Sequence, residues 1–199
     1  MRVCVFCASS TRIDARHLEL AADLGTALAQ RGHSLVSGGG RVGSMGAVAE
    51  AVRAAGGRTI GVIPQALVDM EVADNACDEL LVTETMRERK ALMDSRADAF
   101  VVLPGGIGTL EELFEVWTAR TLGMHDKPIV VLDPEGILSP VRTLVEGLIE
   151  TKFARQVALE TIAWTTSVEQ AMDEVERGDR PVPQPTAEER LEAEPSDGG

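Results

Sequence analysis

The sequence predicts a Rossmann-like α/β fold, in which a doubly wound parallel sheet forms a single domain. Short apolar runs alternate with helical stretches along most of the chain. Several of the runs are followed directly by small, polar or glycine-rich segments. Alternation at this spacing is typical of a parallel sheet that is covered by helices on both faces. A length of 199 residues suits one domain with a substantial core.

The strands are predicted from short runs of apolar, often β-branched residues that end at turn-forming residues. These runs are Arg2–Cys7, His33–Ser37, Arg58–Ile63, Glu79–Val82, Ala99–Leu103, Pro128–Leu132 and Ile162–Trp164. Between the runs, apolar residues recur at helical spacing. The predicted helices are Ala15–Arg31, Met45–Ala55, Met86–Ser95, Thr109–Leu122, Leu138–Ile149 and Val168–Arg177.

The end of the chain differs from the rest in composition. Residues 178–199 contain four of the nine prolines, mostly acidic charge and few apolar groups. A segment of this kind cannot bury enough apolar area to fold. We therefore predict one folded domain over residues 1–177 and a disordered, acidic, proline-rich tail over residues 178–199.

Composition excludes several classes of partner and location. The net charge of −13 argues against binding to nucleic acid or to anionic membranes. No apolar run is long enough to span a bilayer. Three cysteines, an odd number, suit a reducing cytoplasm, and Cys4 and Cys7 are expected to be buried on opposite faces of their strand. The three histidines lack metal-ligand spacing, so no metal site is predicted.

Two glycine-rich turns, Gly38–Gly40 and Gly105–Gly108, each lead from a predicted strand toward a predicted helix. Such turns present bare N–H groups and a positive helix dipole to an anion. A structural alternative is that the glycines only permit tight turns. Because both turns lie at one edge of the sheet, we expect a phosphate site there, with Gly39, Gly40 and the second turn as ligands.

One arginine stands out in the segment MRERKALM. On a helix, Met86, Arg89 and Met93 share one stripe, because residues three and four apart are neighbours. An arginine inside a methionine stripe needs an anionic partner. The alternative is an arginine that extends its charged end to solvent at the domain surface.

The segment TLEE after the second glycine turn has two interpretations. Taken alone, Thr109 and Glu112 resemble a helix capping box, with Thr109 as the N-cap. Beside a phosphate site, however, a carboxylate would repel the ligand. Its presence makes sense if positive charge develops nearby during a reaction. Cleavage of an N-glycosidic bond produces such a charge on the sugar, as glycoside hydrolysis does.

Four stretches with these features occur in a fixed order. They are SGGGRVGSMGAVAEA at 37–51, GVIPQAL at 61–67, MRERKALM at 86–93 and PGGIGTLEE at 104–112, and LGMHDKP follows at 122–128. With them the chain resembles the Lonely Guy family of cytokinin riboside 5′-monophosphate phosphoribohydrolases, long described as lysine decarboxylases. The resemblance covers most of residues 1–150.

The resemblance implies a hydrolase that cleaves nucleoside 5′-monophosphates to free base and ribose 5-phosphate. It implies a homodimer, for which the helix Thr109–Leu122 is a plausible interface, and no cofactor. Arg89 and Glu112 would be the catalytic residues. The implied substrate contacts are Glu71, Met86, Lys90, Gly105, Gly106, Ile107, Gly108, Thr109, Leu110, Glu111 and Thr118.

The expected mechanism divides the work between these groups. The glycine turns hold the 5′-phosphate with help from Lys90, and the adenine lies near Met86. Arg89 orients phosphate or ribose hydroxyls. Glu112 stabilises the oxocarbenium ion and aligns water at C1′.

Two other functions compete with this one. A pyridoxal-phosphate decarboxylase needs a Schiff-base lysine, and the candidates Lys90, Lys127 and Lys152 are poorly placed for that role. A nucleotide-sensing module that binds without cleaving would use the same fold. Such a sensor gains nothing from a carboxylate beside the phosphate, so Arg89 and Glu112 together favour the enzyme.

Overall fold

The computed structural model describes residues 1–70 and 72–178. It contains a seven-stranded sheet in the order β4-β3-β2-β1-β5-β6-β7, with every neighbouring pair parallel. The strands are β1 Arg2–Phe6, β2 Ser34–Ser37, β3 Thr59–Pro64, β4 Glu79–Thr83, β5 Ala99–Val102, β6 Ile129–Leu132 and β7 Ala163–Thr165. The predicted doubly wound parallel sheet is therefore confirmed.

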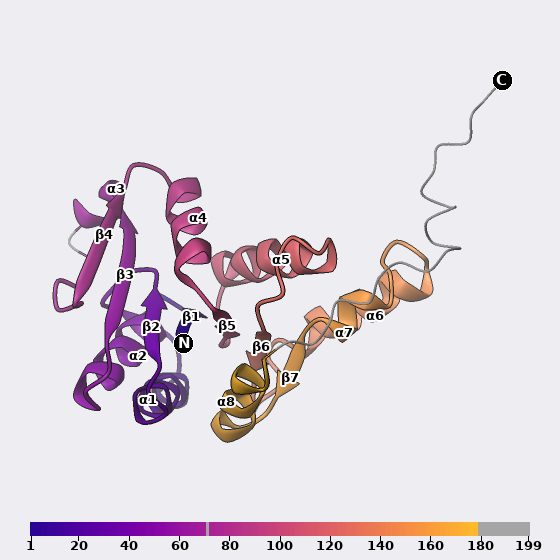
Figure 1. Cartoon of the computed structure of the whole chain (residues 1–199), viewed down its shortest axis with the longest axis horizontal. Helices are drawn as coiled ribbons and strands as arrows, with labels where there is room; N and C mark the ends of the chain where they lie inside the picture. Colours follow the sequence, from indigo (N-terminus) through magenta and orange to yellow (C-terminus); the bar gives the residue numbers. More distant parts are fainter. Residues whose placement is uncertain (71, 179–199) are drawn as a thin grey trace.

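Helices cover both faces of this sheet (Figure 1). On one face, apolar residues of three helices form a core with the strands; these helices are α1 Ala15–Gln30, α2 Gly43–Ala54 and α8 Val168–Arg177. The second core lies on the other face, below α4 Met86–Arg96, α5 Ile107–Thr121, α6 Ser139–Glu150 and α7 Val157–Glu160. Cys7 belongs to the first core and Cys4 to the second, so their predicted burial on opposite faces is confirmed.

Each predicted strand and helix is present, with small shifts at the ends. Two short helices, α3 Gln65–Val68 and α7, were not predicted, because four residues are too few to show a helical period. Helix α4 carries a capping box between Thr85 and Glu88. The predicted tail, apart from Gly178, lies outside the described residues.

The strand order determines where a ligand can enter. After β1 the chain passes to one face of the sheet, and after the neighbouring β5 it passes to the other. A crevice forms at such a point, outside the carboxyl ends of the strands. Within residues 1–70 and 72–178, no helix has the length and apolar character needed to cross a bilayer.

Candidate active site

A cavity of about 450 Å³ opens at this crevice. Its walls come from the segments that follow β1, β2, β3 and β5 and from the beginnings of α4 and α5. The lining residues are Cys7, Ala8, Ser9, Ser10, Gly38, Gly40, Val42, Met45, Ile63, Leu67, Met70, Val72, Met86, Arg89, Gly106, Gly108, Thr109, Glu111 and Glu112.

Arg89 lies at the base of the cavity and is only 5 % exposed. Its Nε donates to the carbonyl of Val62 at 3.0 Å, and Nη2 donates to the carbonyl of Gly38 at 3.3 Å. The third contact is an ion pair, in which Nη1 donates to Oε1 of Glu112 at 3.1 Å. An arginine this deeply buried requires an anionic partner, and Glu112 provides it. The alternative of a solvent-extended Arg89 is therefore wrong.

The first glycine turn is shaped mainly by its neighbours within the chain. A Cβ on Gly38 would overlap the Arg89 guanidinium. Gly39 has a φ of +71° and packs against β3, and its N–H donates to a serine hydroxyl. Gly40 reaches the cavity, but its N–H donates to Sδ of Met45 at 3.2 Å. Two N–H groups that were predicted to bind phosphate are thus bonded inside the protein.

The second glycine turn faces the cavity differently. Helix α5 begins at Ile107 with Gly106 as its N-cap, and no side chain caps it. A Cβ on Gly106 or Gly108 would meet nothing within 4 Å, and neither glycine has a positive φ. Packing and backbone conformation would therefore allow a side chain at both positions. Close approach of a ligand to the backbone would explain why both are glycine. The N–H groups of the first turn, which no side chain caps, and the dipole of α5 favour an anion at this position.

The capping-box interpretation of Thr109 and Glu112 is corrected by the structure. Thr109 is the third residue of α5, 4 % exposed, and lines the cavity above Gly105, where a Cβ would overlap its side chain. Glu112 does not reach back to the helix start, because its carboxylate binds Arg89. Sequence spacing alone could not separate these cases, since the long-range partner lies on another helix.

Glu112 combines burial with an ion pair. It is 9 % exposed, and burial raises the pKa of its carboxyl above the ordinary value, although the Arg89 guanidinium acts in the opposite direction. Desolvation disfavours a charged carboxylate. A carboxylate in this environment interacts strongly with any positive charge that develops beside it, because solvent screens the interaction poorly.

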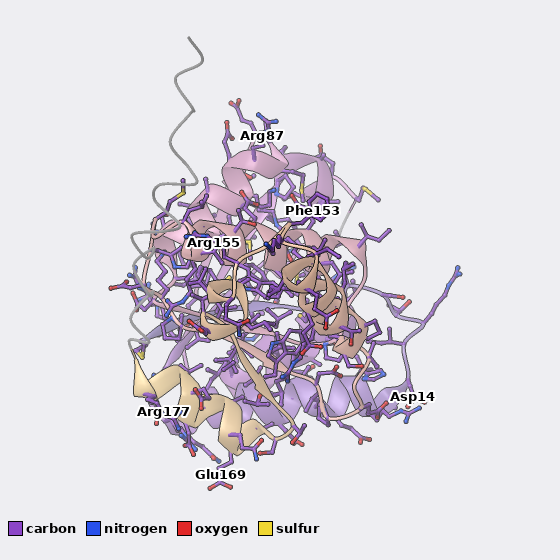
Figure 2. The ribbon with its side chains drawn as sticks, turned by 90° about the vertical axis from the view of Figure 1, so that its right-hand side faces the viewer. Asp14, Arg87, Phe153, Arg155, Glu169 and Arg177 are labelled. Atoms are coloured by element: carbon purple, nitrogen blue, oxygen red, sulfur yellow. The ribbon has the colours of Figure 1, made fainter. Side chains whose placement is uncertain are left out.

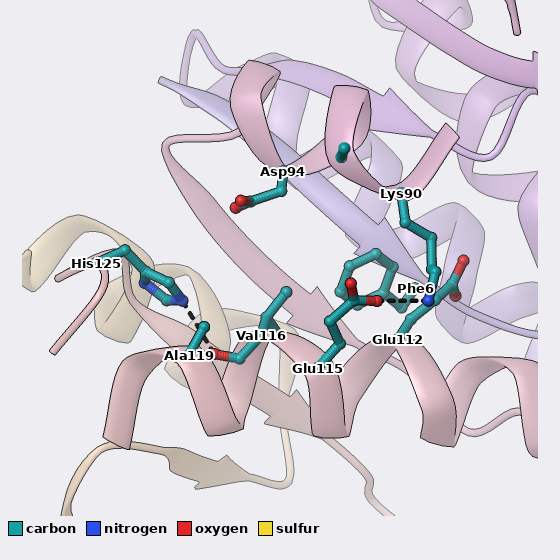
Figure 3. A pocket seen from close by; sticks show the side chains of 9 residues that line it. Phe6, Lys90, Asp94, Glu112, Glu115, Val116, Ala119 and His125 are labelled. Atoms are coloured by element: carbon teal, nitrogen blue, oxygen red, sulfur yellow. Dashed lines mark hydrogen bonds and ion pairs between the residues drawn. The ribbon is translucent and has the colours of Figure 1, made fainter. Parts of the chain in front are cut away.

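Lys90, next to Arg89 on α4, occupies a different place from the one expected. Its ammonium binds Glu111. It also binds Glu115 at 2.6 Å, as Figure 3 shows. It lines a smaller cavity of about 210 Å³ between α4 and α5, which shares Glu112 with the larger one. Arg87 on the same helix points outward into solvent (Figure 2).

The other predicted contacts divide into two groups. Met86 and Glu111 line the larger cavity. Thr118 lies on the outer surface between α4 and α5, Ile107 is 86 % exposed, and Leu110 packs against the core below α5. The remaining contact, residue 71, lies outside the described residues.

Three residues of one wall of the cavity were not predicted as substrate contacts. Leu67, Met70 and Val72, all from the segment between β3 and β4, line the larger cavity together with Ile63 and Met86. This segment follows β3 and α5 follows β5, and β2 and β1 lie between these two strands in the sheet. Only the return of this segment over the sheet brings the three residues to the cavity, so no local pattern identifies them.

Substitution Gly108→Ala tests the anion site without disturbing the fold. Because the added Cβ meets open space, we expect a change in the free energy of unfolding between zero and about 1 kcal/mol of stabilisation, the helix preference for alanine. We also expect the affinity for AMP to fall at least about tenfold, since one methyl group blocks the backbone N–H groups. Thermal denaturation and calorimetric titration with AMP measure the two effects.

Gly147→Ala is the matched control. Gly147 lies inside α6, its added Cβ also meets open space, and it is remote from both cavities. This variant should gain the same stability and bind AMP as the wild type does. Unchanged AMP affinity in Gly108→Ala would remove the start of α5 as the phosphate site.

Comparison with known proteins places the chain among enzymes of one kind. It is 52% identical over 170 residues to the cytokinin riboside 5′-monophosphate phosphoribohydrolase of Mycobacterium tuberculosis, covering 85% of this chain and 90% of the relative. An Arabidopsis thaliana enzyme of the same name is 39% identical over 175 residues, covering 88% of this chain and 82% of the relative.

Solved structures agree with the fold. The structural-genomics target TM1055 has a TM-score of 0.68 at 26% identity, covering 88% of this chain and 98% of that one. The molybdenum cofactor binding protein of Rippkaea orientalis has a TM-score of 0.67 at 21% identity, covering 88% and 95%. At this identity the second likeness concerns the fold alone.

A family described as "Possible lysine decarboxylase" matches residues 45–175. Decarboxylation with pyridoxal phosphate needs a lysine at the reacting centre. All three lysines are described, and none lines the larger cavity. Lys90 is bound by two carboxylates, Lys127 binds Asp94, and Lys152 is exposed. The lysines are therefore unsuited to that chemistry, and the relatives described above are named as phosphoribohydrolases. The chain belongs to the family of cytokinin riboside 5′-monophosphate phosphoribohydrolases.

Proposed function

We propose that this protein hydrolyses the N-glycosidic bond of N6-substituted adenosine 5′-monophosphates, releases the free base and ribose 5-phosphate, and so activates cytokinins. The observation that carries the proposal is the pair of unobstructed glycines, Gly106 and Gly108, beside the buried ion pair of Arg89 and Glu112. A phosphate site next to a buried carboxylate suits a reaction in which the sugar becomes positively charged.

In the proposed complex the nucleotide spans the larger cavity. The 5′-phosphate binds the N–H groups at the start of α5, near Gly106 and Gly108. Lys90 assists because its ammonium neutralises Glu111, the carboxylate on the same wall as the phosphate. The base lies against the apolar wall near Met86, at the opposite end of the cavity.

Arg89 and Glu112 act on the bond between these two ends. As the C1′–N bond breaks, its electron pair leaves with the base, and the carboxylate of Glu112 stabilises the positive charge on the sugar. The oxygen of water then bonds to C1′, and one proton of that water passes to Glu112. The base takes up a proton from solvent and leaves neutral, and Glu112 returns its proton to solvent. Arg89 keeps Glu112 in place and orients the ribose or phosphate oxygens.

The alternative is a module that binds a nucleotide without cleaving it. Incubation with AMP and with N6-isopentenyl-AMP, followed by chromatography for free base and ribose 5-phosphate, separates the two functions. We expect both products in equal amounts. Tight binding of AMP without any release of base would establish the sensor instead.

We propose that the chain forms a homodimer through the face between α4 and α5. Phe114, Leu122 and Met124 expose 37%, 59% and 73% of their surface there, beside Lys90 and Thr118. Light scattering at micromolar concentration should give about twice the chain mass of 21.2 kDa. A mass equal to one chain would contradict the dimer.

We also place the enzyme in the cytoplasm. Its cysteines, Cys4, Cys7 and Cys77, are free thiols. Free thiols fit a reducing compartment.

A further inference from the structure

The apolar wall of the larger cavity has an unusual origin. Leu67, Met70 and Val72 lie in the connection between β3 and β4, which crosses the carboxyl end of the sheet and returns to its other end. A wall made of a connecting segment keeps its shape only if the segment is fixed elsewhere. The contacts that fix it therefore bear on how the base is held.

The connecting segment is bonded to the first glycine turn. The N–H of Arg41 donates to the carbonyl of Val72 at 2.9 Å, and the N–H of Asp74 donates to the carbonyl of Gly39 at 2.8 Å. Between these bonds, Gly40 and Ala73 form an antiparallel bridge. The wall is thus attached to the turn by a short ladder of backbone bonds.

The same turn also holds the catalytic arginine. The carbonyl of Gly38 accepts a hydrogen bond from Arg89 at 3.3 Å. Residues 38–41 therefore contact Arg89 on one side and the base wall on the other. The position of this turn sets the distance between the reacting end of the cavity and the end that receives the base.

An ion pair fixes the ladder from outside the cavity. Nη1 of Arg53, on the last turn of α2, lies 2.7 Å from Oδ2 of Asp74. Asp74 is 5 % exposed, and its Oδ1 accepts the N–H of Ala76 at 3.1 Å. A carboxylate buried to this degree is strongly destabilising without its partner. Arg53 therefore ties the connecting segment to α2, whose first turn lines the same cavity through Met45.

We infer that Arg53 and Asp74 are positioning residues that fix the apolar wall relative to Arg89 and thereby set the selectivity of the enzyme for substituted bases. The inference rests on the proposed function. Neither residue lines the larger cavity, so both act through the ladder to Val72. A loosened wall should harm a substrate with an apolar N6 group more than AMP, because the grip on phosphate and ribose remains intact.

Arg53→Gln and Asp74→Asn test this inference, and the readout is a ratio. The ratio of kcat/KM for N6-isopentenyl-AMP to that for AMP should fall about tenfold, the scale of one charge-assisted contact. The change should appear mainly in KM for the substituted nucleotide. Arg53→Lys, which retains a cation, should restore part of the ratio. Amide hydrogen exchange in the peptide that contains Val72 and Asp74 should become faster in both variants.

Arg2→Gln is the matched control. It breaks another pair of an arginine and an aspartate, in which Nη2 of Arg2 lies 2.8 Å from Oδ1 of Asp98. That pair joins residues at the amino ends of β1 and β5, at the edge of the sheet opposite the cavity. The control should lower the melting temperature and leave the substrate ratio unchanged.

Two results would overturn the inference. One is a ratio within about twofold of wild type in both variants, with melting temperatures lowered as in the control. The other is unchanged hydrogen exchange in the connecting segment. If the wild type cleaved neither nucleotide, the proposed function would fail, and the exchange measurement together with calorimetric binding of N6-isopentenyl-AMP relative to AMP would still test the positioning role.

Discussion

AMP should be cleaved with a kcat/KM about 10²–10⁴ times higher than that of adenosine, because removal of the phosphate loses two charge-assisted hydrogen bonds of roughly 1.5–3 kcal/mol each. The proposed donors are the N–H groups at the start of α5, where Gly106 and Gly108 leave the backbone unobstructed. Part of the loss should appear in kcat, because binding energy from the phosphate positions the sugar for reaction. Steady-state kinetics with both substrates measures each part.

ADP and ATP provide the control for simple charge attraction. If overall attraction of anions governed the rate, the longer nucleotides would react at least as well as AMP. A site built from one helix start holds one phosphoryl group, so we expect both to react more slowly. Comparable cleavage of adenosine and AMP would refute the phosphate site, even if hydrolysis itself were observed.

Glu112→Gln should lower turnover at least about 10²-fold while AMP still binds, because the variant loses the charge that stabilises the oxocarbenium ion. The amide is nearly the same size, and Arg89 keeps a hydrogen-bond acceptor at 3.1 Å. Turnover is measured under saturating AMP and binding by calorimetry. The exposed Glu19→Gln on α1 is the control and should behave as wild type.

The pH profile supplies a second signature of Glu112. The proposed mechanism uses its carboxylate form, so activity should fall as the pH drops through the pKa of Glu112. Burial raises that pKa, so the fall should be centred above the ordinary glutamate value of about 4.3. Near-normal turnover of the Glu112→Gln variant would contradict a catalytic role of Glu112. The role would also be contradicted if the residual activity of the variant fell at low pH in the same way as the activity of the wild type.

The fold was predictable because local patterns determine most of it. Short apolar runs such as Ala99–Val102 are typical of strands buried on both sides, and they alternate with amphipathic helices. Arg89 was also predictable, since a cation within a methionine stripe requires an anion whatever the partner is. Both inferences use contacts between residues a few positions apart.

Contacts between segments that lie far apart in the chain could not be predicted from the sequence. The two glycine turns have similar sequences, yet the first accommodates the Arg89 side chain, whereas the second borders open space and no side chain caps its helix. Lys90 follows Arg89 directly, yet it does not line the larger cavity, and its ammonium binds Glu111 and Glu115. These differences depend on which side chain of another helix or strand lies beside each residue. The spacing of residues within one segment does not predict that neighbour.

Gly38 illustrates what such packing means for the tolerance of the chain to mutation. It has no side chain that could touch a substrate, but the space of its missing Cβ is occupied by the Arg89 guanidinium. Any replacement at position 38 would therefore displace the arginine from its ion pair with Glu112. In a systematic mutational scan, this glycine would be as intolerant as the catalytic residues themselves. Position 38 therefore depends on the side chain at position 89, although 51 positions separate them.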